Sequence, residues 1–212
     1  MSEGARGAAG ASVSGGSVAG ASVPGASVSG ASVSGLEARL ASVASLADRA
    51  RSAPQTSGRR SVVLVDGRSG TGKTTLGNAL GESLGWRVVH LDDVYPGWDG
   101  LRAASSAVVT EVLGEASGYR RWDWARSAPA GWVSLDPTAP LVIEGCGSLS
   151  RASAPLATLR VWMEADDDVR KRRALDRDGD VFAAEWERWA RQEDAFIASE
   201  DPVALADVVL RS

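Results

Sequence analysis

The sequence predicts an α/β fold built around a parallel sheet of about five strands, with helices on both faces. Apolar runs of strand length alternate along the chain with segments in which apolar residues recur at helical spacing, and this order is typical of parallel sheets. Between the first run and the helix after it, residues 67–74 match the phosphate-binding pattern G-x-x-x-x-G-K-[ST]. That pattern requires a strand before it and a helix after it. The sequence therefore predicts a nucleotide-binding α/β domain.

The expected elements follow one another in order. The first strand covers 61–66, and the helix after the glycine-rich segment places Leu76, Leu80 and Leu84 on one face. Further strands are expected at the short apolar runs 87–91, 141–143, 159–163 and 207–210. Helices are expected between them, at 103–116, 167–176 and 183–199. Because ligands of such sheets bind at the carboxyl ends of the strands, the residues just after each strand are the candidates for function.

The glycine-rich segment carries the prediction of nucleotide binding in a P-loop NTPase fold. Its glycines let the backbone aim successive N–H groups at a polyphosphate, which lies against the positive end of the following helix. We expect Lys73 to reach the β- and γ-phosphates of ATP and Thr74 to hold Mg²⁺. A GTPase would need an Asn-Lys-x-Asp segment, and Asn78 is the only asparagine. The expected nucleotide-binding residues are Gly67, Arg68, Ser69, Gly70, Thr71, Gly72, Lys73, Thr74 and Thr75.

The N-terminal segment differs in composition from the rest of the chain. Residues 11–35 repeat a five-residue unit of small residues such as Ala-Ser-Val-Ser-Gly, and such a segment buries too little apolar surface to offset its ordering entropy. We therefore expect a disordered tail over 1–35. Apolar residues at helical spacing then predict an amphipathic helix and a linker over 36–58, followed by the nucleotide-binding domain over 59–212.

Composition argues against several classes of protein. The net charge of −4, with arginines interleaved among acidic residues, provides no basic field for nucleic acid. No apolar run approaches the roughly 20 residues that span a bilayer. Cys146 is the only cysteine, so we expect no internal disulfide and a reducing, cytoplasmic location. The expected partner is a small molecule, and the sequence leaves the oligomeric state open.

Acidic residues follow two of the expected strands, Asp92 after the second and Glu144 after the third. A carboxylate beside the phosphate loop is where Mg²⁺ or its water shell would be held, so we assign Glu144 and Thr74 to the metal. Asp92 is then free to accept the proton of a substrate hydroxyl that attacks the γ-phosphoryl group. Each acid alone would more often be a helix N-cap or a solvated loop carboxylate. Their convergence at strand ends favours the catalytic role.

Three arginines on the helix expected after the fourth strand, Arg170, Arg173 and Arg177, are spaced three and four residues apart and share one face. They would close over the triphosphate as an Arg-rich lid and stabilise charge in the transition state, so we count them among the catalytic residues with Asp92 and Lys73. A solvated helix face is the alternative. The turn-like segment 176–180 favours a mobile lid.

These motifs together resemble the uridine kinase-like branch of the P-loop kinases, which also includes nicotinamide riboside kinases. The resemblance covers about 61–210 and rests on 65–75, 90–95, 143–145 and the arginine-rich stretch from residue 170. It implies a kinase in which Asp92 is the base for a ribose hydroxyl and Glu144 serves the metal. This chain departs from the pattern at Val94, where the family has an aromatic residue before the position of Tyr95.

The segment between the second and third strands also departs from that family, because tryptophans and aspartates replace its Tyr-Asp-Phe region. Aromatic rings would stack on a planar base while carboxylates hold sugar hydroxyls, but the same residues would serve equally well in packing. The candidate acceptor-binding residues are Asp92, Tyr95, Trp98, Asp99 and Asp123.

Other residues with reactive or aromatic side chains are expected to be structural. Trp186 and Trp189 on the late helix fit a core role. His90 is interpreted as a structural histidine. Cys146 is interpreted as a small buried side chain, because no base stands near it in the sequence.

The sequence thus predicts a kinase that transfers the γ-phosphoryl group of Mg·ATP to a hydroxyl of a nucleoside-like acceptor. Two alternatives stay open. A non-catalytic ATP-binding regulatory protein would not need Asp92 to face the γ-phosphate. A P-loop kinase acting on a non-nucleoside metabolite or an antibiotic would share every motif and differ only in its acceptor pocket.

Overall fold

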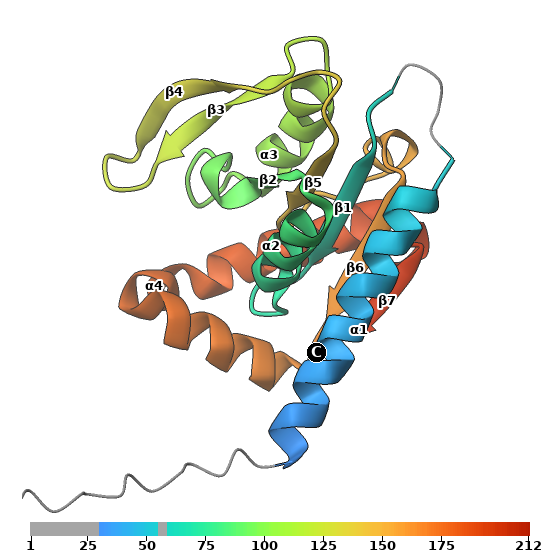
Figure 1. Cartoon of the computed structure of the whole chain (residues 1–212). Coiled ribbons are helices and arrows are strands. Elements are labelled where there is room, and N and C mark those ends of the chain that lie inside the picture. The colour runs from blue at the N-terminus through green and yellow to red at the C-terminus, as the bar shows by residue number, and fades with distance from the viewer. Residues whose placement is uncertain (1–29, 55–58) are drawn as a thin grey trace, which may run out of the picture.

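The computed structural model describes residues 30–54 and 59–212. Its centre is a five-stranded sheet in the order β2-β5-β1-β6-β7, in which all neighbouring strands are parallel. The predicted α/β fold with a five-stranded parallel sheet is confirmed (Figure 1). Most of the predicted tail, residues 1–29, and residues 55–58 of the predicted linker lie outside the described part of the chain.

The strands form at the short apolar runs, each within one residue of its expected bounds. They are β1 Val62–Gly67, β2 Arg87–His90, β5 Leu141–Glu144, β6 Leu159–Glu164 and β7 Val208–Arg211. Every residue of β1 is buried. Leu64 of this strand packs in one hydrophobic cluster and Val63 and Val65 pack in another, as the two-residue period of a strand requires. The sheet is therefore covered on both faces.

Two helices cover one face of the sheet, α1 Gly30–Ser52 and α2 Lys73–Leu84. Leu46 of α1 and Leu80 of α2 are buried in the same cluster as Val63. α1 begins at residue 30 rather than at the expected residue 36, so it includes the last unit of the repeat. Figure 1 shows α1 lying along the sheet beside α2.

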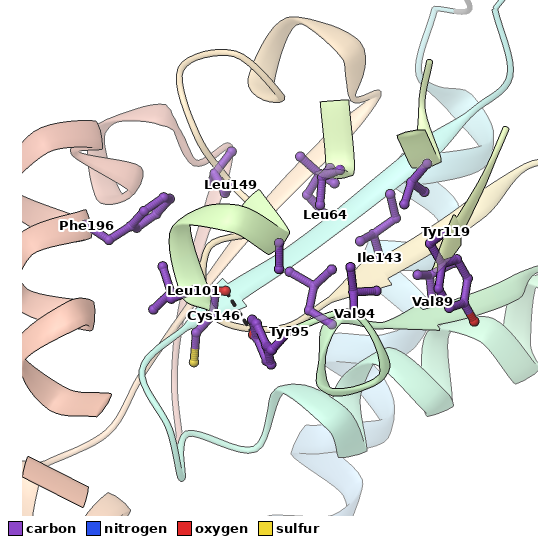
Figure 2. Packing of buried hydrophobic residues seen from close by; sticks show 14 of the residues in the cluster. Leu64, Val89, Val94, Tyr95, Leu101, Tyr119, Ile143, Cys146, Leu149 and Phe196 are labelled. Carbon is purple, nitrogen blue, oxygen red and sulfur yellow. Dashed lines mark hydrogen bonds between the residues drawn. The ribbon is translucent and has the colours of Figure 1, made fainter. Parts of the chain in front are cut away.

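The other face is covered by α3 Leu101–Ala107, which continues into a π-helical turn, Val108–Val112, and by α4 Asp167–Glu200. Figure 2 shows the cluster that these elements form with the sheet, in which Leu64 of β1 and Phe196 of α4 are both buried. The short elements are the 3₁₀ turns Leu91–Asp93 and Ala154–Leu156 and the helix α5 Pro202–Leu205.

α4 bends where the sequence predicts a turn between two helices. Gly179 has φ 65° and ψ −153°, a conformation that glycine adopts at little steric cost. The chain turns at this one residue and the helix resumes directly, so the two expected helices are the two arms of α4. The bend lies to the left of the sheet in Figure 1.

An antiparallel hairpin, β3 Gly118–Asp123 and β4 Ala128–Ser134, was not expected from the sequence. β3 carries two adjacent arginines in its middle and has no apolar alternation, and the link to β4 lacks the Asn-Gly or Asp-Gly pair that marks a tight hairpin. Within residues 30–54 and 59–212, no helix is both long and apolar enough to cross a membrane.

Candidate active site

The phosphate loop runs from the end of β1 into the first turn of α2. Gly70 and Gly72 have φ of 81° and 89°, in the left-handed region that favours glycine. Gly70 has a second requirement, because a Cβ built there would overlap the backbone carbonyl group of Arg170 on α4. α4 is therefore packed directly against the loop.

Lys73, the first residue of α2, is only 8% exposed. Its Nζ donates a hydrogen bond of 2.9 Å to the carbonyl oxygen of Arg68, so the side chain crosses the loop. Burial alone would lower the pKa of Lys73, but surrounding acidic groups, Glu144, Glu193 and Asp66 among them, raise it above its ordinary value. The ammonium group therefore stays charged at neutral pH, as phosphate binding requires.

A buried carboxylate on α4 holds the loop in place. Glu193 is 3% exposed, and its Oε1 accepts hydrogen bonds from the N–H and hydroxyl of Ser69, both at 2.8 Å, and from Trp189 Nε1 at 3.1 Å. Its Oε2 lies 3.9 Å from a nitrogen of Arg68 and 3.8 Å from one of Arg170. No sequence pattern indicates this contact, because Ser69 and Glu193 are 124 residues apart.

The structure brings the two predicted metal ligands together, Glu144 at the carboxyl end of β5 and Thr74 in the first turn of α2. Glu144 ends β5, is 2% exposed, and its Oε2 accepts a hydrogen bond of 3.3 Å from the Thr74 hydroxyl. His90 ends β2 directly opposite Glu144 in register, and its Nδ1 lies 2.6 Å from Glu144 Oε1. Asp92 follows two residues later, in the 3₁₀ turn after β2.

A cleft of about 440 Å³ joins the phosphate loop to these strand ends. Lys73 and Thr74 line it together with Asp92 and Glu144, and Arg177 contributes from α4. Desolvation in the cleft and the neighbouring Glu144 carboxylate raise the pKa of Asp92, whereas Lys73 and Arg177 partly oppose the shift. A carboxylate with a raised pKa beside a phosphate loop has the properties of a general base.

Aromatic side chains form much of the remaining wall of the cleft. The ring centroids of Trp98 and Trp124 lie 4.8 Å apart, and Phe182 stacks on Trp98 at 5.6 Å. Trp189 is buried in the core, as expected, and also lines the cleft. Of these residues, Phe182 was not singled out from the sequence. Tyr95 lines the cleft too, while its hydroxyl donates to the carbonyl oxygen of Cys146 at 2.9 Å (Figure 2).

The unexpected hairpin reaches the site through the residue that follows β3. Trp124 Nε1 donates a hydrogen bond of 2.8 Å to the backbone carbonyl oxygen of Asp92. A side-chain nitrogen of Arg121, on β3, lies 3.7 Å from a carboxylate oxygen of Asp93. The hairpin and the 3₁₀ turn after β2 are therefore fixed to each other beside the cleft.

The three candidate lid arginines do not meet at one place. Arg177 lines the cleft and pairs with Asp178 at 2.7 Å. Arg170 is buried on the other side of the loop, and Arg173 donates to the hydroxyl of Ser212. The reason is helical rise, since seven residues of helix move a side chain about 10 Å along the axis even where the face is kept. The lid itself stays a prediction.

Two acidic residues predicted to bind the acceptor lie outside the cleft. Asp99 is exposed and forms an ion pair with Arg188 of α4. Asp123 ends β3 and accepts a hydrogen bond of 3.0 Å from the backbone N–H of Arg126 within the hairpin. Each carboxylate is paired with an arginine, Asp99 with Arg188 and Asp123 with Arg126, and an acceptor-binding role for either aspartate stays a prediction. Tyr95 and Trp98, by contrast, do line the cleft.

A second cavity, of about 580 Å³, lies on the other side of the phosphate loop. Arg68 and Thr71 line it from the loop, Arg170 from α4 and Ser212 from the chain end. The loop therefore separates two cavities, and its predicted residues divide between them. The exceptions are Gly67, at the end of β1, and Thr75, exposed on α2, which line neither cavity.

The oxygen atoms at the loop fit the predicted Mg²⁺. The part of the chain that the structure describes contains no cluster of three or more His, Cys, Asp or Glu side chains placed to hold a metal. Mg²⁺ does not need one, because it keeps several waters and takes one or two protein oxygens together with substrate phosphates. The Thr74 hydroxyl and the Glu144 carboxylate, 3.3 Å apart, provide such oxygens.

Comparison with known proteins finds solved structures that share the fold of this chain. A possible uridine kinase from Bacillus stearothermophilus matches 83% of this chain and 99% of its own with a TM-score of 0.58 and 20% sequence identity. A protein assigned as a fructose transport system kinase from Silicibacter sp. TM1040 matches 81% of this chain and 98% of its own, with a TM-score of 0.51 and 20% identity. No protein-family model and no curated protein sequence matches the chain. At this identity the two structures show the fold, and the nicotinamide riboside kinase branch stays a prediction.

Proposed function

We propose that this protein is an ATP-dependent small-molecule kinase that phosphorylates a hydroxyl group of a nucleoside-like acceptor. The observation that carries the proposal is that Lys73, Thr74 and Asp92 line one cleft with an aromatic wall. A phosphate-binding loop alone is common to many nucleotide-binding proteins. An aspartate with a raised pKa, opening into the same cleft, supplies the base that phosphoryl transfer to an alcohol uses.

The two cavities fit the two substrates of such a reaction. In this proposal the base and ribose of ATP take the cavity beside Arg68, Thr71 and Arg170, and the phosphates lie along the loop toward the cleft. The acceptor takes the cleft, where Trp98 and Trp124 offer faces for a planar ring. A cytoplasmic location, where ATP is present, belongs to the same proposal.

The chemistry follows from these positions. Asp92 accepts the proton of the acceptor hydroxyl while the oxygen of that hydroxyl forms a bond to the γ-phosphorus of ATP. The bond between the γ-phosphorus and the β-γ bridging oxygen breaks, and ADP is released. Lys73 and Arg177 stabilise the negative charge on the transferring group. Thr74 and Glu144 would hold Mg²⁺, directly or through its waters, and the bound ion would neutralise charge on the β- and γ-phosphates.

Two alternatives make different predictions. A kinase for a sugar, another non-nucleoside metabolite or an antibiotic would use the same loop and base, but the aromatic wall of the cleft favours a planar group. A non-catalytic ATP-binding regulatory protein would bind ATP and leave it intact whichever hydroxyl compound is added.

The experiment that tests the proposal is an ATP-consumption screen of the purified chain against nucleosides, other ribosides, sugars and hydroxylated antibiotics. We expect ADP release that depends on one class of acceptor, with the phosphorylated product seen by mass spectrometry. Lys73→Ala should abolish it, because the β- and γ-phosphates lose their fixed cation. ATP binding without acceptor-dependent ADP release across the panel would favour the regulatory protein.

A further inference from the structure

His90 is the only histidine of the chain, and its contacts connect it to the proposed metal site. It lies opposite Glu144 in the β2–β5 register, and its Nδ1 is 2.6 Å from Glu144 Oε1. The other carboxylate oxygen, Oε2, lies 3.3 Å from the hydroxyl of Thr74. Each oxygen of this buried carboxylate therefore has its own partner, one on the edge strand and one on the phosphate loop.

The stem of Glu144 is also held by packing. A Cβ built at Gly77, one turn into α2, would lie 2.9 Å from Cγ of Glu144. Because glycine has no side chain, the aliphatic part of the Glu144 side chain fills this space. Packing of the stem does not fix the last torsion of a glutamate, because rotation about the bond to a carboxylate is broad. A directed hydrogen bond to one oxygen does fix it.

We propose that His90 is a positioning residue, which donates its Nδ1–H to Glu144 Oε1 and thereby turns Oε2 toward Thr74 and the metal. This inference rests on the proposed function, because it assigns a task to a residue next to the Mg²⁺ site. The contact has the same form in both charge states of the ring, since Nδ1 carries a hydrogen in the imidazolium and in the Nδ1–H tautomer. Partners of this kind orient metal-binding side chains and tune their affinity.

A purely structural role for His90 is poorly supported by its surroundings. Its side chain is 32% exposed, it belongs to neither hydrophobic cluster, and β2 is an edge strand of the sheet. It lines neither the cleft nor the cavity on the other side of the phosphate loop, so it does not contact a substrate there. The hydrogen bond to Glu144 is the contact through which it reaches the site.

The test measures metal binding directly, without turnover. Mn²⁺ replaces Mg²⁺ as the probe, and electron paramagnetic resonance follows free Mn²⁺ during its titration into the protein with ADP bound. We expect His90→Leu to weaken Mn²⁺ binding about 10- to 100-fold, the usual effect of losing such a partner. His90→Asn should stay within about threefold of wild type, because the asparagine amide can donate from nearly the same place as Nδ1.

Arg87→Leu is the matched control, since Arg87 is an exposed residue on the same strand and does not contact Glu144. Its Mn²⁺ affinity should equal that of wild type, and circular dichroism should show all variants folded. Wild-type affinity in His90→Leu, or an equal loss in His90→Leu and His90→Asn, would overturn the inference and leave the proposed function standing. A wild-type chain that binds no Mn²⁺ together with ADP would overturn both.

Discussion

Asp92 shows how the site is built at the expense of stability. Asp92 as a whole is an exposed residue, but partial desolvation of its carboxyl group in the cleft and the nearby Glu144 and Asp178 raise its pKa in the folded chain, which the cations Lys73 and Arg177 only partly offset. At pH values between the pKa of Asp92 in the unfolded chain and its higher pKa in the folded chain, the folded state therefore binds more protons than the unfolded state. Stability falls as pH rises through that window, and ionised Asp92 is a net cost at neutral pH.

Asp92→Asn should therefore raise the Tm at pH 7 to 8, and the gain should shrink as the pH falls toward 4, where the wild-type carboxyl is also protonated. Asp207 is the opposite case, because its hydrogen bonds with Arg160 lower the pKa of its carboxyl. Asp207→Asn should lower the Tm at neutral pH. Thermal unfolding across this pH range measures whether each substitution raises or lowers the Tm. A Tm for Asp92→Asn below that of wild type at pH 8 would contradict the account.

Gly70 tests the loop geometry at a single residue. It combines a positive φ with a close approach by the carbonyl of Arg170, whereas Gly85 at the end of α2 has φ 68° and nothing within 4 Å of a built Cβ. Gly85→Ala should lower the free energy of unfolding by about 1 kcal/mol, because alanine disfavours the left-handed backbone conformation of this residue. Gly70→Ala should cost more and should also weaken ADP binding. Equal free energies of unfolding in the two variants, measured in urea, would argue against the tight loop–α4 contact.

At the scale of elements, the sequence predicted what local patterns determine. The five sheet strands lie within one residue of their expected bounds, because the strands of a parallel sheet are continuous apolar runs, and β1 and β5 are buried along their whole length. Both arms of α4 were expected, and Gly179 between them marked the bend. Thr74 could be named from the phosphate-loop motif, and Asp92 and Glu144 from the rule that strand ends converge in a parallel sheet.

The parts that were missed are not marked by any pattern in their local sequence. The β3–β4 hairpin has few buried residues and no recognisable turn pair, so its local sequence gives no strand signal. Glu193 looks like one of many charged residues on a helix until the fold brings Ser69 to it. The partners of Asp99 and Asp123 could not be foreseen, because Arg188 lies 89 residues from Asp99 and Arg126 pairs with Asp123 inside the hairpin that was not expected.

The hairpin itself makes a testable prediction through Trp124. Trp124→Phe keeps a ring in the cleft but removes the donor to the Asp92 carbonyl, and one such hydrogen bond contributes about 0.5–1.5 kcal/mol. We expect kcat to fall up to about tenfold while the KM for the acceptor changes little. Trp132 is an exposed tryptophan on β4 of the same hairpin, and Trp132→Phe should leave both kcat and the KM for the acceptor unchanged. A change confined to KM would mean that Trp124 only contacts the acceptor.

At the scale of the whole molecule, α1 packs on the sheet as part of the folded domain. Leu46, Ala47 and Ala50 of α1 are buried against the sheet, and Arg51 donates to the carbonyl oxygen of Ser83 at 2.6 Å. Deleting residues 1–29 should leave the Tm and ADP binding nearly unchanged. Deleting residues 1–52 should lower the Tm strongly, because it exposes one face of the sheet. A large loss from the shorter deletion would show that the repeat packs on the domain.

The central claim is that the molecule transfers a phosphoryl group with Asp92 as base, and the most direct measurement of it is the turnover of Asp92→Asn with the acceptor found in the screen. General-base catalysis contributes about 10²- to 10⁴-fold in rate, so kcat should fall by that factor. The affinity for ADP should stay within about threefold of wild type. The reason is that, among the described residues, no hydrogen bond joins Asp92 to the phosphate loop. Turnover close to wild type in Asp92→Asn, with ADP affinity unchanged, would contradict the account and move the base to another residue.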